Sequence, residues 1–282
     1  MKGPQERSPL FFRRLTAVYL ACMVSVFLLF TGGDYQQITE RKALLYGLLS
    51  GAYLLVYLVG RLELALVGAL RLPTPAALWR SLNLTQKLVT VFWLLAVAST
   101  VFSVDPATAL WGSPRRDGLI TLTLYCGCFL LVSGSGRPGA WLLGLFGGAV
   151  SLHCVLSLLQ LMGLNPLALY PRGMTYYDGG KLYAGQFLGT IGNVDLVSAV
   201  LCIAVPAFWI AMLKGRGKLR FLLIIPLALS LTVLFWSFVA GGVVGVCGSL
   251  LLTIPVLPRK ARLRRWLAVI MAAVLLIGLA AV

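Results

Sequence analysis

The sequence alternates between long apolar runs and short polar segments. Several runs approach the length of about 20 residues that a helix needs to cross the hydrocarbon core of a bilayer. The pattern therefore predicts an all-α fold, a polytopic transmembrane helix bundle of about nine spans in which residues 1–282 form a single domain. The expected spans are residues 15–31, 43–59, 88–104, 119–132, 141–162, 194–212, 221–236, 239–256 and 266–282.

Composition supports this class of protein. Hydrophobic residues make up 60% of the chain, against about 45–50% in an ordinary soluble domain. The mean hydropathy is +0.93, and only 11% of the residues are charged. These values exclude a soluble globular domain and indicate a multi-pass membrane protein.

The formal net charge of +16 is distributed in a way that argues against nucleic-acid binding. The Lys and Arg residues lie in short segments between apolar runs, and no basic groove or recognition helix can be traced. With a cytoplasmic N-terminus, 18 of the 24 Lys and Arg residues fall on the cytoplasmic side, as the positive-inside rule predicts. Residues 1–14 and the basic segment 257–265 are then cytoplasmic, and residues 105–118 and 163–190 are loops on the outer face.

The polar segment 102–120 concentrates charge between two expected spans. Arg115 and Arg116 follow a Gly-Ser-Pro turn and precede Asp117. Arginine presents a planar fork of donors that matches phosphate oxygens, so these residues are candidates for binding a diphosphate. The alternative is that the two arginines bind lipid headgroups or pair with Asp105 and Asp117.

The second outer loop, residues 163–190, holds Arg172 and leads into the expected span at 194–212. Asn193 stands where a helix N-cap is favoured, and the free N–H groups of a helix start attract an anion. Asp195 follows at or just inside the membrane, where an ionisable group indicates function. Its alternative role is to complement the helix dipole.

Two runs of the sequence resemble the signatures of one family. The run FSVDPATALWGSPRRDGL at 102–119 resembles the S-x-D-P … G-S-x-x-R-x-D/E-G-L signature of the O-antigen ligase and O-antigen polymerase superfamily, with one residue fewer before the acidic position. The run GTIGNVDLVSA at 189–199 is similar to the G-T-x-G-N-x-(N/D)-x-x-(S/A) motif of the same family. The two motifs occur in the family's order, and the resemblance covers roughly residues 35–260.

The resemblance implies a GT-C-like membrane glycosyltransferase of the bacterial plasma membrane, acting in cell-surface polysaccharide assembly. Such enzymes take a glycan from a polyprenyl diphosphate carrier and join it to an acceptor, and they need neither a metal nor a cofactor. Arg116 matches the arginine of the family's motif that holds the diphosphate. Arg172, in the next outer loop, is the second candidate.

The chain departs from the family pattern in two further places. Phe238 stands where the family commonly has an arginine, and no large late outer loop with a histidine follows. That histidine is the family's general base, so no catalytic residue is assigned here. We therefore expect the chain to correspond to the N-terminal part of such an enzyme, inactive without a missing C-terminal half or a partner subunit.

Two other classes of function stay open. A transporter of lipid-linked sugars would also need outward-facing arginines, although it would be expected to show internal repeats and charges near the membrane midplane. A structural membrane subunit would need no phosphate-binding pair. Neither alternative is excluded by the residues themselves.

The remaining polar and small residues have mainly structural interpretations. His153 lies inside an expected span, and a hydrogen bond to a neighbouring helix is more common at such a position than catalysis. The six cysteines all lie within apolar runs, so no metal site is expected. Three pairs of glycines with small-xxx-small spacing are expected to let helices approach closely. They are Gly47/Gly51, Gly144/Gly148 and Gly241/Gly245.

Overall fold

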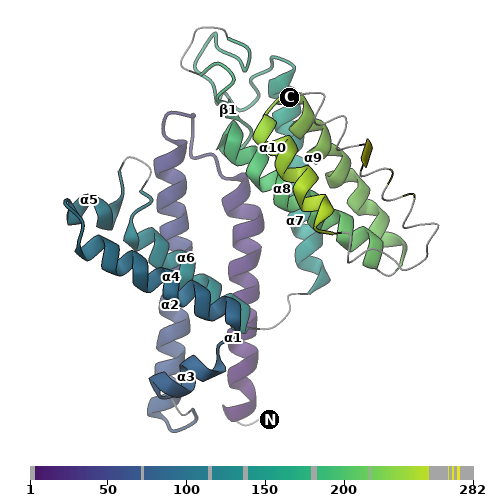
Figure 1. Ribbon diagram of the computed structural model, residues 1–282. Coiled ribbons are helices and arrows are strands. Elements are labelled where there is room, and N and C mark those ends of the chain that lie inside the picture. The colour runs from purple at the N-terminus through teal and green to yellow at the C-terminus, as the bar shows by residue number, and fades with distance from the viewer. Residues whose placement is uncertain are drawn as a thin grey trace. The chain divides into compact units, whose positions relative to one another are not determined.

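The computed structural model describes residues 4–70, 73–113, 116–135, 139–178, 183–215, 217–253, 266, 269, 272 and 273, without the side chains of residues 4–9, 218 and 219. Within these residues the chain is mostly helical (Figure 1). Five helices are long and apolar enough to cross a membrane, and three shorter apolar helices accompany them. The helical content and these five helices confirm the expectation of a mainly α-helical protein with membrane-spanning character.

Ten α-helices, two shorter helices of other types and one small hairpin make up the described chain (Figure 1). The α-helices are α1 (Pro4–Cys22), α2 (Ile38–Leu66), α3 (Pro75–Ser81), α4 (Leu84–Val101), α5 (Pro106–Trp111), α6 (Leu119–Gly134), α7 (Ala140–Leu161), α8 (Val194–Lys214), α9 (Ile224–Trp236) and α10 (Ala240–Leu251). The others are the π-helix η1 (Met23–Phe27), the 3-10 helix η2 (Lys218–Leu223) and the strands β1 (Phe187–Leu188) and β2 (Gly192–Asn193).

Several helix ends differ from the expected spans. α1 begins at Pro4, so most of the expected cytoplasmic N-terminus 1–14 is helical. α2 continues to Leu66, seven residues past the expected end at Val59, and so takes in Arg61 and Glu63. Both differences have one cause: a charged side chain at the end of a span can reach the interface along its own stem, so charge does not end the helix.

The predictions for the C-terminal part fall mostly outside the described residues. The basic segment 257–265 cannot be compared with the structure for this reason. The ninth expected span is represented by residues 266, 269, 272 and 273, which are helical.

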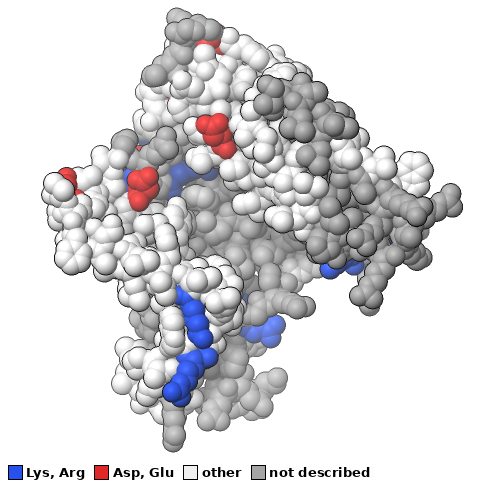
Figure 2. All heavy atoms as spheres, viewed as in Figure 1, with Lys and Arg blue, Asp and Glu red and all other residues white. Residues whose placement is uncertain are grey.

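The chain divides into two compact units, which we describe separately. Unit 1 comprises Met1–Met23 and Thr39–Gly139, and unit 2 comprises Val24–Ile38 and Ala140–Val282. In unit 1, Tyr19 stacks on Tyr53 with ring centroids 4.3 Å apart, and both pack with Cys128 of α6. Figure 2 shows Lys and Arg side chains over the end of unit 1 that holds α3, and Asp and Glu side chains near α5.

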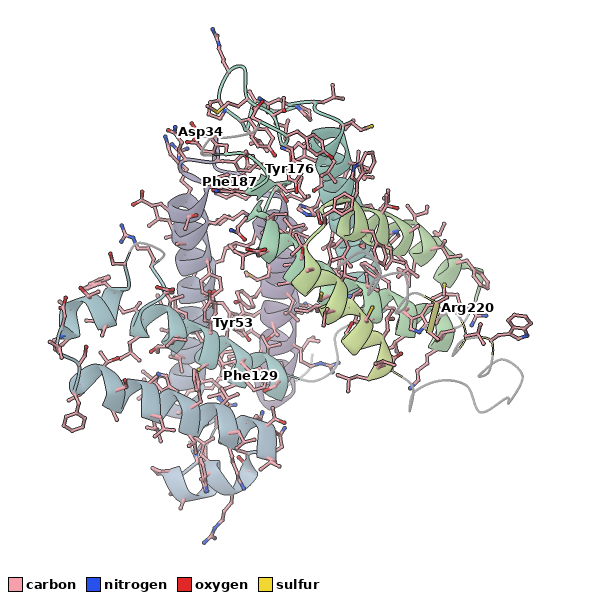
Figure 3. The ribbon with its side chains drawn as sticks, turned by 45° about the horizontal axis from the view of Figure 1, so that its top comes forward. Asp34, Tyr53, Phe129, Tyr176, Phe187 and Arg220 are labelled. Atoms are coloured by element: carbon pink, nitrogen blue, oxygen red, sulfur yellow. The ribbon has the colours of Figure 1, made fainter. Side chains whose placement is uncertain are left out.

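Unit 2 contains the larger core, which α7, α8, α9 and α10 share. Several α8 side chains are fully buried, among them Val197, Leu201 and Phe208. Close approach of α10 to α8 depends on Gly242, because a Cβ there would lie 2.6 Å from Cβ of Ser198. The polar loops that precede α8 cover one end of this core, and Tyr176 and Phe187 lie there at the end that also carries Asp34 (Figure 3).

The glycine pairs behave differently from one another. Gly245 lies against α8, because a Cβ there would come within 2.9 Å of Sγ of Cys202. In contrast, a Cβ added to either member of the other two pairs, or to Gly241, would meet no described atom within 4 Å. The prediction of close helix contact is therefore right for Gly245 and wrong for the rest. The five pair members that make no close helix contact are Gly47, Gly51, Gly144, Gly148 and Gly241.

Candidate functional site

The first candidate element is a turn in unit 1, formed by Gly112, Ser113 and residues 116–118, which we call the arginine turn. Its two glycines bring the ends of the turn together. A Cβ on Gly112 would lie 2.4 Å from the backbone N of Asp117, and one on Gly118 would lie 2.4 Å from the N of Gly112. Gly112 also has a φ of +76°. Only glycine fits at both ends, so these residues fix where Arg116 stands.

Arg116 itself adopts an uncommon backbone conformation. Its φ is +57°, in the left-handed region that non-glycine residues seldom occupy. The hydroxyl of Thr121 in the first turn of α6 donates a hydrogen bond to the Arg116 carbonyl at 2.5 Å. Strained backbone of this kind persists where surrounding contacts hold it, and it occurs preferentially at functional sites.

The guanidinium of Arg116 pairs with Glu40 at the start of α2. Nη2 lies 3.0 Å from Oε1 of Glu40, and the two side chains are 49% and 63% exposed. The expected alternative, pairing of Arg116 with Asp105 or Asp117, is therefore wrong: the partner comes from a segment 76 residues away.

Asp105 and Asp117 have different surroundings. Asp105 caps α5 and accepts hydrogen bonds from the backbone N and the hydroxyl of Thr108, at 3.1 and 2.5 Å. These bonds lower the pKa of the Asp105 carboxyl, which therefore stays ionised and engaged in the cap. Asp117 is exposed beside Arg116. Arg115 lies outside the described residues.

The second candidate element is the hairpin of unit 2, in which β1 pairs with β2. We call residues 189–191, which join the two strands, the threonine turn. Asn193 caps α8 as predicted, because its Oδ1 accepts hydrogen bonds from the backbone N of Asp195 and of Leu196 at 2.9 and 3.1 Å. Asp195 is exposed in the first turn of α8. Its carboxylate thus lies where it complements the positive end of the helix dipole.

A closed ring of hydrogen bonds holds Gly189 in this turn. The Gly189 N–H donates to Oε1 of Gln160 at 2.6 Å, and Nε2 of Gln160 donates to the Tyr35 hydroxyl at 2.8 Å. That hydroxyl lies 2.8 Å from the Gly189 carbonyl, to which it donates. Burial raises the pKa of the Tyr35 phenol, so it stays protonated and remains a donor. Both backbone groups of Gly189 are thereby satisfied by side chains from distant segments.

His153 of α7 holds the next residue of the turn. The imidazole is fully buried, and its Nδ1 lies 2.8 Å from Oγ1 of Thr190 and 3.2 Å from the Thr190 backbone N. The Thr190 hydroxyl donates to the carbonyl of Leu28 at 2.7 Å. His153 was expected to bond to a neighbouring helix, and the structure shows it bonded to the threonine turn before α8.

The remaining candidate, Arg172, is exposed in the loop before the hairpin. Among the described residues it forms no ion pair or hydrogen bond. The structure brings Asn193 and Asp195 together at the start of α8, and Arg116 and Asp117 together in the arginine turn. These two groups belong to different units, and Arg172 belongs with the α8 group in unit 2.

Sequence reasoning missed the residues that hold both turns. Glu40 is an acidic residue at the start of an apolar run, and Gln160 is a polar residue near the end of another. Gln160 interrupts an otherwise apolar segment, which is a usable signal, whereas Glu40 lies among other polar residues and has none. Nothing local identifies the partner of either residue. Comparison of the chain with protein-family models, with curated proteins and with solved structures finds no match.

Proposed function

We propose that this chain is a membrane protein of the O-antigen ligase and polymerase type that binds polyprenyl diphosphate-linked glycans on the outer face of a bacterial plasma membrane. The proposal includes the finer architecture, about nine spans in a GT-C-like bundle. Its support in the sequence is the pair of motif-like runs at 102–119 and 189–199. The single observation that carries it is the position of Arg116.

Arg116 has the properties of an anion-binding group that is ready to exchange partners. Its backbone is held in the left-handed region by a turn whose ends only glycine allows. Its guanidinium is half-exposed and paired with an even more exposed carboxylate. Exposed ion pairs contribute at most about 1 kcal/mol, so a diphosphate, with more charge and bidentate geometry, can displace Glu40 at little cost.

The proposed role is to hold the donor. Fixed cations stabilise the negative charge that develops on a diphosphate leaving group without a metal ion. Asp105 is poorly suited to act as a general base, because it is engaged in the α5 cap and its pKa is lowered. We assign donor binding, and not activation of the acceptor, to the arginine turn.

Donor binding tests the proposal directly. The chain is purified in lipid nanodiscs, and binding of a radiolabelled polyprenyl diphosphate is measured for the parent, Arg116→Ala and Arg116→Lys. Loss of a charge-assisted bidentate contact is expected to weaken binding by about ten- to hundredfold. Arg116→Lys should also weaken binding, because lysine keeps the charge and loses the planar fork.

Arg80→Ala is the matched control. Arg80 is an exposed arginine of the same unit, in the last turn of α3, a segment expected on the cytoplasmic side. It should bind the diphosphate like the parent. Equal affinity of Arg116→Ala and the parent would reject the proposal.

A further inference from the structure

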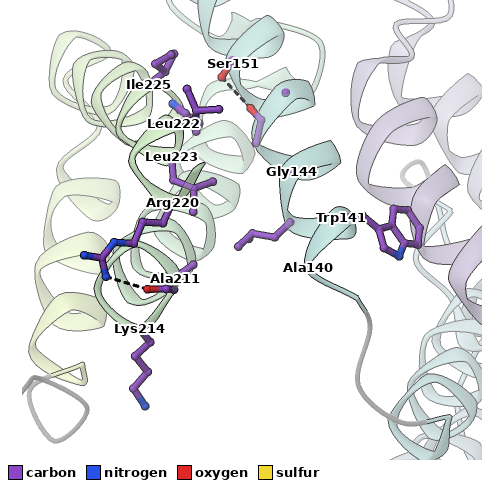
Figure 4. Close-up of a pocket in the computed structure, with 15 residues that line it drawn as sticks. Ala140, Trp141, Gly144, Ser151, Ala211, Lys214, Arg220, Leu222, Leu223 and Ile225 are labelled. Atoms are coloured by element: carbon purple, nitrogen blue, oxygen red, sulfur yellow. Dashed lines mark hydrogen bonds between the residues drawn. The ribbon is translucent and has the colours of Figure 1, made fainter. Parts of the chain in front are cut away.

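Unit 2 contains a pocket at the end of the bundle remote from the threonine turn. It lies among the first half of α7, the end of α8, η2 and the start of α9, and its volume is about 860 Å³. Leu143, Leu222, Leu223 and Ile225 give it apolar walls. Figure 4 shows Lys214 at one end of the pocket, below Arg220, and Ser151 and Ile225 at the other end.

The described residues that line the charged end of this pocket include cations and no carboxylate. Lys214 and Arg220 line it, and the segments 140–151 and 211–226 contain no acidic residue. The Arg220 guanidinium donates one hydrogen bond, from Nη1 to the carbonyl of Gly215 at 2.8 Å. Its Nε is buried and has no hydrogen-bond partner among the described residues. The guanidinium therefore has donors left for an anion.

Glycines of α7 make the apolar part of the pocket wide. Gly144 and Gly148 line it, and a Cβ on either would meet no described atom within 4 Å. Between them, Gly147 does pack closely, because its Cβ would lie 3.4 Å from Cγ of Pro226. Pro226 thus holds α9 against α7 at Gly147, while the flanking glycines leave open space. The result is an apolar groove that ends at two cations.

We propose that this pocket binds one anionic phospholipid. The phosphate lies between Lys214 and Arg220, and an acyl chain occupies the groove beside Gly144 and Gly148. Basic pockets between membrane helices bind anionic lipid headgroups in this way. The apolar walls distinguish a lipid from a free phosphate, since only a lipid places hydrocarbon next to its phosphate. The inference is independent of the proposed donor binding, which rests on Arg116 in unit 1.

Native mass spectrometry of the purified chain tests the proposal. The probes are phosphatidylglycerol, phosphatidylcholine with the same acyl chains, and glycerol 3-phosphate, each titrated onto delipidated protein. We expect one phosphatidylglycerol to be retained, with phosphatidylcholine and the free headgroup binding at least about tenfold more weakly. Arg220→Gln should lower phosphatidylglycerol affinity by about ten- to hundredfold, because a charge-assisted contact is lost.

Gly148→Leu distinguishes binding of an acyl chain in the groove from general attraction between the lipid and the positive charges. It keeps every charge, and its Cβ has free space, so the chain is expected to fold while the leucine fills the groove. Phosphatidylglycerol affinity should fall about tenfold. Arg80→Gln removes one charge from unit 1 and should leave the retained lipid unchanged.

Three results would overturn the proposal. Unchanged phosphatidylglycerol retention by Gly148→Leu would show that the groove holds no chain. Equal losses in Arg80→Gln and Arg220→Gln would show that only the net charge matters. Binding of glycerol 3-phosphate as tight as that of the lipid would make the pocket a site for a soluble phosphate. None of these results bears on binding of the diphosphate by Arg116.

Discussion

The arginine turn and the threonine turn use glycine in similar ways and present different chemistry. Each precedes an apolar helix, α6 in one case and α8 in the other. Each also has a glycine that cannot carry a side chain without a clash, Gly112 in one and Gly189 in the other. The arginine turn presents a half-exposed guanidinium paired with Glu40. In the threonine turn, Gly189 and Thr190 are bonded to fully buried side chains of α7.

This difference in burial suggests that the arginine turn serves ligand binding and the threonine turn stabilises the fold. An exposed ion pair contributes little to folding, so its charges can serve a ligand. A buried hydrogen-bond network contributes mainly by avoiding unsatisfied polar groups, and removing one member leaves others unpaired. We therefore expect substitutions in the threonine turn to change stability and substitutions in the arginine turn to change affinity.

The largest expected effect concerns which side of the membrane the two turns face. The distribution of Lys and Arg predicts the outer face for both loops. Ser113→Cys and Arg172→Cys, at two exposed positions, should each react with an impermeant maleimide in intact cells. Ser81→Cys, in the loop expected inside, should react only after permeabilisation. Labelling of Ser113→Cys and Arg172→Cys from opposite sides would contradict a shared outer face.

Gly189→Ala is expected to be the most destabilising substitution in the threonine turn. The new Cβ would lie 2.3 Å from Cε1 of His153 and 2.5 Å from Oγ of Ser157, and φ is +61°. We expect a loss of about 3 kcal/mol or more, from a steric clash added to left-handed strain. Thermal unfolding in detergent measures the loss.

Gly185→Ala is the control that separates the two causes. Its φ is +58°, and a Cβ there would meet no described atom within 4 Å. It should therefore show the strain alone, about 1–2 kcal/mol. Equal losses at Gly185 and Gly189 would show that the contact with His153 is not restrictive.

Gln160→Leu should destabilise less, by about 2–3 kcal/mol, because the buried Gly189 N–H loses its acceptor. Tyr35→Phe keeps that bond and removes only the hydroxyl, so a smaller loss of about 1–2 kcal/mol is expected. The same unfolding measurement compares them. A larger loss for Tyr35→Phe than for Gln160→Leu would mean that the bond from the Tyr35 hydroxyl to the Gly189 carbonyl, and not the bond from the Gly189 N–H to Gln160, controls this turn.

Local rules predicted one part of this structure well. Apolar runs correctly located the helical segments, since a span is defined by its own composition. Asn193 was identified as an N-cap because its bonds reach only to the backbone of Asp195 and Leu196. Helix ends were predicted less well: α2 continues through Arg61 and Glu63 to Leu66, past the expected end of that span at Val59.

Long-range pairing could not be predicted from the same signals. Glu40 and Arg116 are 76 residues apart, and Tyr35 and Gln160 are 125 apart. Their contacts depend on how helices pack, which no local pattern encodes. Gly144 and Gly148 show the same limit, because small-xxx-small spacing predicted a helix contact and the structure has open space there. A glycine pair permits close approach without requiring it.

The smallest expected effect is the most specific for the arginine turn. If Glu40 occupies the place that a diphosphate takes, Glu40→Gln should strengthen diphosphate binding by removing a competitor for the guanidinium of Arg116. Exposed pairs are worth at most about 1 kcal/mol, so the gain should not exceed about fivefold. Glu63→Gln removes the same charge from an exposed position near the other end of α2 and should leave affinity unchanged. Weaker binding by Glu40→Gln would mean that Glu40 orients Arg116 for the ligand instead of competing with it.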